Sequence, residues 1–241
     1  MGRPRSPLVS TLPAFDPRQV PVVARDADLP AVPVQRLAAD DLRRWFRQPP
    51  DWTPEIRAEA RWVDGPQKPA AVLVPLVWRP RPTVLLTQRA AHLPTHAGQV
   101  AFPGGKLDAN DAGDPVRCAL REAHEEVGVA PAWVEPLGTL PVYATGSGFD
   151  VTPVVALVHP QGPWRPNPHE VADAFEVPLD YLMDPRHHRH HEWVWAGATR
   201  RWLSMPYADA TGERFIWGAT AGMLRNLYRF LQAATAAMMR A

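Results

Sequence analysis

The most informative stretch of this 241-residue chain is REAHEEVG, residues 121–128. If it forms a helix, Glu122, Glu125 and Glu126 lie at positions i, i+3 and i+4, which brings the three carboxylates to one face. Like charges at that spacing repel each other, so the pattern implies a positive charge opposite them. Three acidic groups on one face supply the hard oxygen ligands that Mg²⁺ or Mn²⁺ binds. The sequence therefore predicts a divalent metal site here, with the metal removing the repulsion.

The flanking residues predict the helix itself. Across residues 114–127 apolar side chains recur at helical spacing, and Gly128 stands where a helix would end. The predicted inward stripe consists of Val116, Ala119, Leu120 and Ala123. The glutamates fall mostly off this stripe and are free to face a site. A solvated acidic face balanced by Arg117 and Arg121 is the alternative interpretation.

A glycine turn precedes the helix. Residues 102–105 read FPGG, and a turn with two glycines lets the backbone approach other groups closely and offer a carbonyl oxygen to the same metal. A loop, a glycine turn and an acid-rich helix together favour a phosphate and metal site over a plain solvated face.

Composition narrows the functional classes. The net charge is +1, from 26 Lys and Arg against 25 Asp and Glu, which gives no global attraction to nucleic acid or to an anionic membrane. Cys118 is the single cysteine, which excludes an internal disulfide and favours a reducing compartment. The longest apolar run, residues 70–78, is too short to span a bilayer, and the N-terminus lacks the apolar stretch of a signal peptide. We therefore expect a cytoplasmic protein. A homodimer is an option that the sequence leaves open.

The remaining sequence predicts one α/β domain over residues 36–241. Residues 1–35 are proline-rich and predict an arm that is extended or partly disordered. Asp40 and Asp41 are expected to cap a short helix, and a closing helix is expected over residues 222–239. Strands are predicted at residues 70–78, 83–89, 136–144, 152–158 and 200–207.

The acidic segment and its glycine turn resemble the box of the Nudix hydrolases. That box runs glycine, five residues, glutamate, seven residues, then R-E-apolar-x-E-E-x-G-apolar. Gly105 matches the first glycine, and the second half is matched by Arg121, Glu122, Ala123, Glu125, Glu126, Gly128 and Val129. Asp111 stands where the box has its first glutamate, and the gap to Arg121 is two residues longer than the standard. We expect the extra residues to bulge the loop before the helix.

The resemblance implies a fold and a set of roles. The fold would be a Nudix-type α/β/α sandwich with a mixed β-sheet, the box covering about residues 105–129. The metal would be held by the Gly105 carbonyl and by Glu122, Glu125 and Glu126, while Arg121 keeps the glutamates in place through ion pairs. The general base stays open between Glu122, Glu125 and Glu170, because the superfamily often draws its base from a later loop.

A second resemblance points to a branch of the superfamily. Residues 85–105, LLTQRAAHLPTHAGQVAFPGG, are similar to the signature that the coenzyme A pyrophosphatases carry before their box. The implied reaction cleaves coenzyme A or acyl-CoA to 3′,5′-ADP and 4′-phosphopantetheine, with Arg89, Gly104 and Gly105 contacting the small-molecule nucleotide. Pro94 departs from the signature, which usually has arginine there. This departure keeps open one alternative, hydrolysis of ADP-ribose or another nucleoside diphosphate derivative. A second alternative, of another class, is a non-catalytic domain that binds a nucleotide.

One histidine cluster invites a different metal. His187, His188, His190 and His191 fall within the run HHRHH, residues 187–191. The run could hold a transition metal, but it follows Asp184-Pro185 and therefore favours a flexible polar loop.

Overall fold

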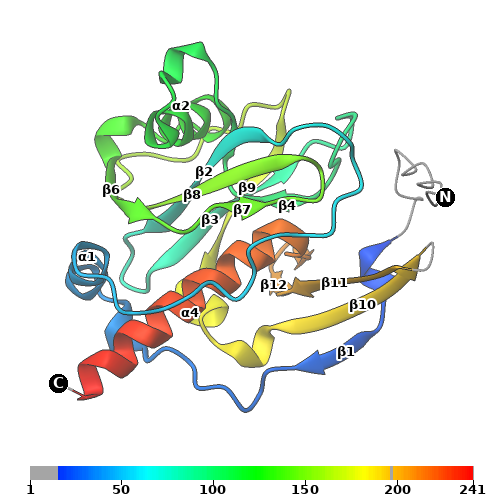
Figure 1. Ribbon diagram of the computed structural model, residues 1–241. Helices are drawn as coiled ribbons and strands as arrows, with labels where there is room; N and C mark the ends of the chain where they lie inside the picture. Colours follow the sequence, from blue (N-terminus) through cyan, green and yellow to red (C-terminus); the bar gives the residue numbers. More distant parts are fainter. Residues whose placement is uncertain (1–15, 196–197, 241) are drawn as a thin grey trace.

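The computed structural model describes residues 16–195 and 198–240, and a mixed eight-stranded sheet lies at its centre (Figure 1). Among the described residues the central pair of strands, β2 and β8, is parallel, and the other pairings of this sheet are antiparallel. The order across the sheet is β4-β3-β2-β8-β6, with β5 on β2, β7 on β8 and β9 on β3. The strands are β2 (Lys68–Val77), β3 (Thr83–Arg89), β4 (Val100–Ala101), β5 (Gly104–Lys106), β6 (Val134–Thr139), β7 (Tyr143–Ala144), β8 (Phe149–Val158) and β9 (Val171–Pro178). The predicted strands at 70–78, 83–89 and 152–158 are confirmed, and the strand predicted over 136–144 is divided between β6 and β7.

The sheet is covered on both faces because its central strand is apolar on both. Side chains alternate along β2, so that Leu73 and Val77 pack toward α2 (Pro115–Val127), while Val74 and Leu76 join the opposite core. That opposite core includes α4 (Gly218–Arg240), which runs below the sheet in Figure 1 while α2 lies above it. The predicted α/β/α sandwich with a mixed sheet is therefore confirmed.

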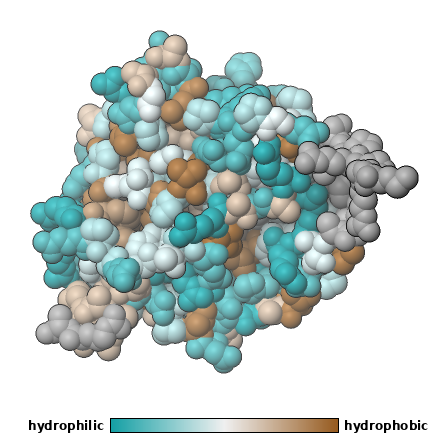
Figure 2. Space-filling view, in the orientation of Figure 1, coloured by the Kyte–Doolittle hydropathy of each residue, from teal (hydrophilic) through white to brown (hydrophobic). Residues whose placement is uncertain are grey.

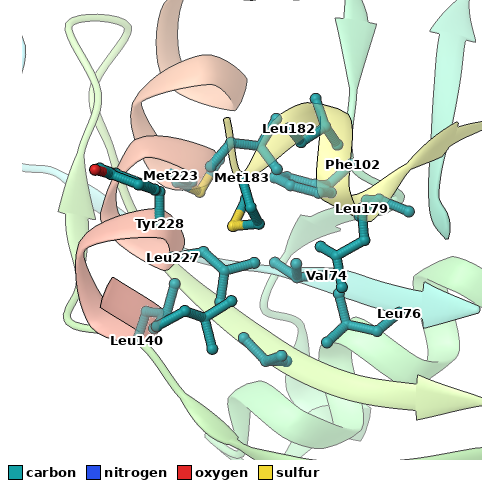
Figure 3. Close-up of a cluster of buried hydrophobic side chains, with 14 of the residues drawn as sticks. Val74, Leu76, Phe102, Leu140, Leu179, Leu182, Met183, Met223, Leu227 and Tyr228 are labelled. Carbon is teal, nitrogen blue, oxygen red and sulfur yellow. The ribbon is translucent and has the colours of Figure 1, made fainter. Parts of the chain in front are cut away.

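The larger core lies between the sheet and α4. Figure 3 shows Val74 and Leu76 of β2 facing Leu227 of α4 among buried aliphatic and sulfur-containing side chains. Leu227 has no exposed surface. The closing helix begins at Gly218, four residues before the predicted start.

A separate three-stranded sheet, in the order β1-β10-β11, contains His190 and His191 of the histidine run, while His187 ends a 3-10 turn and His188 directly precedes β10. Its strands are β1 (Val22–Arg25), β10 (Arg189–Trp195) and β11 (Ala198–Ser204). The prediction of a flexible polar loop at residues 187–191 is wrong, because His188 and His191 are buried within hydrogen bonds. The His188 ring lies 2.8 Å from the Leu182 carbonyl oxygen, and the His191 ring lies 2.8 Å from Ser204 Oγ. The polar residues of the run masked the pattern of β10, a strand that is buried on one side only, and so the sequence favoured a loop.

The remaining elements connect these layers. Helix α1 (Ala39–Arg47) begins after Ala38, which makes no side-chain cap. The predicted capping by Asp40 and Asp41 is wrong, since both lie inside the first turn, where their charges favour the helix dipole instead. The others are α3 (Leu179–Leu182), the hairpin strands β12 (Tyr207–Asp209) and β13 (Gly212–Arg214), and 3-10 turns at Pro17–Gln19, Val34–Leu37, Ala109–Asp111, Pro131–Trp133 and Pro185–His187.

The N-terminal arm contributes structure where it is described. Residues 1–15 lie outside the described residues, but β1 pairs with β10 and Val32 is buried in the main core. The division of the chain at residue 35 stays a prediction. No helix in the described residues is long and apolar enough to cross a membrane. On the face shown in Figure 2, hydrophobic residues are scattered among hydrophilic ones.

Candidate active site

Helix α2 is defined at both ends by its own sequence. The Asp114 side chain caps the first turn by accepting a hydrogen bond from the Val116 backbone N–H at 2.8 Å, and Pro115 occupies the first helical position. At the other end Gly128 adopts a left-handed conformation with φ of 71°, a backbone geometry that suits glycine. Cys118, Ala119, Ala123 and Val127 pack against the sheet. The predicted helix and its stop are confirmed.

The glycine turn lies directly against two of the glutamates. Gly104 donates its backbone N–H to Glu126 Oε2 at 3.1 Å. A β-carbon on Gly105 would lie 2.5 Å from Cδ of Glu122, so a larger residue there would displace that carboxylate. The fold therefore brings together Gly104, Gly105, Glu122 and Glu126, as the sequence predicted.

Arg121 holds the acidic face together. One terminal nitrogen, Nη1, lies 2.9 Å from Glu122 Oε1 and 3.1 Å from Glu125 Oε2. Its Nε and Nη2 donate to the two carboxylate oxygens of Asp111 at 3.0 and 2.9 Å. The observed ion pairs match those expected of Arg121, and they raise the pKa of the guanidinium further above its ordinary value.

Asp111 is the site residue whose position the sequence left unresolved. Its side chain is 2% exposed, and its hydrogen bonds from Arg121 lower the pKa of the carboxyl to about 2. The longer loop does not bulge freely. It forms a 3-10 turn over Ala109–Asp111, in which Asp108 and Asp111 make reciprocal bonds to each other's backbone N–H groups. The Asp-x-x-Asp pattern of a capping box was the signal that could have located this turn.

Burial raises the pKa values of two of the glutamates. Glu126 is 4% exposed, and burial raises the pKa of its carboxyl to about 7, against the opposing hydrogen bond from Gly104. Burial also raises the pKa of Glu122, with smaller contributions from the charges of Glu125 and Glu170. These carboxylates are held close together at a cost in charge repulsion, which a cation would relieve.

The carboxylate and carbonyl oxygens of this cluster are ligands that suit a hard divalent cation, but the side chains do not form a preorganised metal site. Within residues 16–195 and 198–240, no three His, Cys, Asp or Glu side chains stand together as a metal-binding group. Arg121 engages Glu122 and Glu125, and the thiol of Cys118 lies 3.6 Å from the Gly105 carbonyl oxygen. The predicted ligand set of Gly105, Glu122, Glu125 and Glu126 therefore stays a prediction.

Two more predicted residues lie at the edge of the cluster. Arg89 ends β3, and its charge acts to lower the pKa of Glu126. Its Nε is buried and makes no hydrogen bond within the described part of the chain. Glu170 is exposed in the turn before β9, and its negative charge acts on both Glu122 and Glu126. The fold thus brings both residues near the glutamates.

Sequence comparison identifies relatives of this chain. A family model described as "NUDIX domain" matches residues 67–196. Proteins named "Uncharacterized Nudix hydrolase NudL" from Salmonella paratyphi B and Salmonella newport are each 47% identical over 162 residues, which is 67% of this chain and 81% of each relative.

Structural comparison finds similar chains at greater distance. A Nudix hydrolase from M. smegmatis, RenU, is 27% identical, with a TM-score of 0.42, over 52% of this chain and 79% of its own. The NUDIX domain of Shewanella oneidensis NrtR, solved with ADP ribose, is 22% identical, with a TM-score of 0.38, over 48% of this chain and 75% of its own. On the family model and the relatives at 47% identity, the chain belongs to the Nudix hydrolase family.

Proposed function

We propose that this Nudix hydrolase cleaves the diphosphate of coenzyme A or an acyl-CoA, giving 3′,5′-ADP and 4′-phosphopantetheine or its acyl form. The observation that carries the proposal is the path of residues 85–105. This segment resembles the signature of the coenzyme A pyrophosphatases, and it leads from the second half of β3, which ends at Arg89, to the glycine turn that faces Glu122 and Glu126. The signature residues thus adjoin the acidic cluster that would act on the diphosphate.

A divalent cation is part of the proposal. Mg²⁺ or Mn²⁺, when bound by Glu122, Glu125, Glu126 and the Gly105 carbonyl, would neutralise the diphosphate oxygens and orient water for in-line attack. The roles of the chain's own residues follow from their surroundings.

Arg121 positions the glutamates, and the guanidinium of Arg89, at the end of β3, contacts a diphosphate oxygen. Water adds to one phosphorus atom and the bridging P–O bond breaks, so the bridging oxygen leaves with the other product. We assign proton abstraction from that water to Glu170 rather than to Glu122 or Glu125, because Arg121 engages those two while Glu170 makes no ion pair among the described residues.

The test is the identity of the products. Purified protein with Mn²⁺ is incubated with coenzyme A, acetyl-CoA and ADP-ribose, and the products are separated by chromatography. The proposal predicts 3′,5′-ADP together with 4′-phosphopantetheine. AMP and ribose 5-phosphate from ADP-ribose, with coenzyme A not cleaved, would instead identify the protein as a hydrolase of ADP-ribose.

Hydrolysis of ADP-ribose or another nucleoside diphosphate derivative is a second candidate function because of one residue. Pro94 stands where the coenzyme A signature usually has arginine, so one expected phosphate contact is missing. A non-catalytic nucleotide-binding role is disfavoured, because such domains usually lose box acids and this chain keeps Glu122, Glu125 and Glu126.

A further inference from the structure

A cavity of about 230 Å³ lies away from the acidic helix face, between the segment 56–60, β7, β11 and the start of α4. Its polar lining comes from Glu59, Tyr143, Thr199 and Arg201, and Gly218 at the first turn of α4 closes one side. None of these residues belongs to the Nudix box.

Glu59 is the distinctive group of this cavity. Its Oε1 accepts a hydrogen bond from the Tyr143 hydroxyl at 3.1 Å, and its Oε2 accepts one from the Gly146 backbone N–H at 2.9 Å. No Lys, Arg or His among the described residues forms a salt bridge with this carboxylate. Burial raises the pKa of Glu59 and that of Tyr143 beside it. Each carboxylate oxygen retains a lone pair, so the side chain can accept a further hydrogen bond.

The walls of the cavity disfavour ions of either sign. The carboxylate of Glu59 repels a phosphate. The positive end of the α4 dipole, which begins at Gly218, opposes a cation, and the guanidinium of Arg201 adds to this although Glu192 pairs with it at 2.6 Å. A neutral group that donates a hydrogen bond, such as an amide or a hydroxyl, satisfies Glu59 without either conflict.

Strand register relates the cavity to the active site. Lys106 of β5 pairs with Ala70 of β2, which pairs with Val151 of β8, which pairs with Tyr143 of β7. Three strand spacings separate Lys106 from Tyr143, or about 14 Å. The charge of His96, in the loop that follows Arg89, also acts on the pKa of Glu59. The cavity and the diphosphate site therefore lie at the same end of the sheet.

We propose that this cavity binds the neutral, amide-bearing arm of the substrate while the diphosphate lies at the acidic face. The inference rests on the proposed function, since it assigns a place to the pantetheine part of coenzyme A. That arm is about as long as four extended residues, or roughly 14 Å, and it carries amide and hydroxyl donors. Glu59 accepts a hydrogen bond from one of them and determines specificity without touching the reacting phosphorus.

The test compares two substrates on one variant. Glu59→Gln keeps the size of the side chain and removes its charge, so it weakens a charge-assisted hydrogen bond to the arm. We expect kcat/KM for coenzyme A to fall about ten-fold or more, mainly through KM, while kcat/KM for a diphosphate ester with methyl in place of pantetheine stays within about two-fold. Glu213→Gln, an exposed glutamate of β13 outside the cavity, is the matched control and should change neither.

A second variant avoids disturbing the bonds of Glu59. Thr199 is exposed on β11 at the cavity wall, so Thr199→Tyr fills the space without removing a buried partner. It should reproduce the selective loss on coenzyme A with an unchanged melting temperature. If the wild type and both variants cleave coenzyme A with the same ratio of kcat/KM for coenzyme A to kcat/KM for the methyl ester, this inference is overturned and the proposed function stands. If the wild type does not cleave coenzyme A, both this inference and the proposed function are overturned.

Discussion

Two arginines in this molecule, Arg225 and Arg121, each bind several acidic side chains. The charges around Arg225 balance, whereas acidic groups are in excess around Arg121. Arg225 of α4 is 1% exposed; its Nε donates to Glu55 at 2.8 Å, and its Nη1 lies 2.9 Å from Asp26. Arg229 also pairs with Glu55. Two cations thus meet two carboxylates, and the charges balance within a network that ties α4 to the N-terminal segment.

Arg121 stands in an unbalanced cluster. It lies within 3.1 Å of carboxylate oxygens of Asp111, Glu122 and Glu125, and 3.7 Å from Asp108. One cation therefore faces four acids, with buried Glu126 as a further neighbour of Glu122. A balanced buried network stabilises the fold, whereas an excess of acidic groups favours binding of a cation, as proposed above.

The largest expected effect lies in the unbalanced cluster. Glu122→Gln should lower kcat by about a thousand-fold, because it removes a carboxylate that would hold the divalent cation against the diphosphate. The melting temperature should stay the same or rise, since the repulsion also disappears. Steady-state kinetics with Mn²⁺ and calorimetric melting check both. Unchanged hydrolysis would contradict the assigned mechanism, and Glu213→Gln is the control.

The balanced cluster should respond in the opposite way. Arg225→Met leaves Asp26 and Glu55 without their buried partner, which should destabilise the fold by about 3 kcal/mol. Urea denaturation measures this change. At a temperature where the variant is folded, kcat should lie within about two-fold of the wild type. A large loss of kcat with little loss of stability would show that the two clusters are not separate in role.

Asp111 tests the link between loop and helix. Asp111→Asn removes a buried, charge-assisted pair with Arg121 and should cost about 2 kcal/mol of stability. The folded pKa of about 2 lies below the ordinary value of 3.8, so this contribution is present above about pH 4 and is lost as pH falls toward 2. Unfolding free energies at pH 7 and at pH 3 should therefore differ less in the variant than in the wild type. Equal pH dependence would show that the pair contributes nothing.

The smallest effect expected at pH 7 concerns a histidine in the balanced cluster, whose contribution changes only as the pH falls. His188 Nε2 donates to the Leu182 carbonyl oxygen, so Nδ1 must accept from Arg225, and protonation would break that bond. Burial lowers the pKa of His188 from 6.5 to about 4. An unfolded chain takes up this proton first, so stability is full above about pH 6.5 and is lost as pH falls toward 4.

The expected loss is at most about 1.4 kcal/mol per pH unit in that window. His188→Gln keeps a donor and an acceptor but cannot titrate. Urea denaturation at pH 7, 6 and 5 should show a shallower dependence in this variant than in the wild type. Parallel curves would contradict the assigned role of His188.

Local patterns made the catalytic half of the molecule predictable. The helix stripe, its terminal glycine and the spacing of Glu122, Glu125 and Glu126 are all properties of neighbouring residues, and the structure has the helix as expected. The position of Gly105 against Glu122 followed from the need for a close backbone approach.

Long-range pairing was the part that the sequence did not reveal. The HHRHH run looked like a loop because its burial depends on Val20 and Ser204, which are distant in sequence. The cavity at Glu59 is likewise assembled from four separate segments. The role of Asp111 was missed for a milder reason, since its partner Arg121 lies ten residues away across an insertion.

Titration of the protein with Mn²⁺ in a calorimeter, with and without a non-hydrolysable diphosphate analogue, tests the central claim most directly. The account predicts saturable uptake by the wild type that Glu122→Gln and Glu126→Gln weaken strongly and Glu55→Gln leaves unchanged. Absence of Mn²⁺ uptake by the wild type under either condition, or equal uptake by all the variants, would contradict the claim that a divalent cation binds the excess carboxylates of α2.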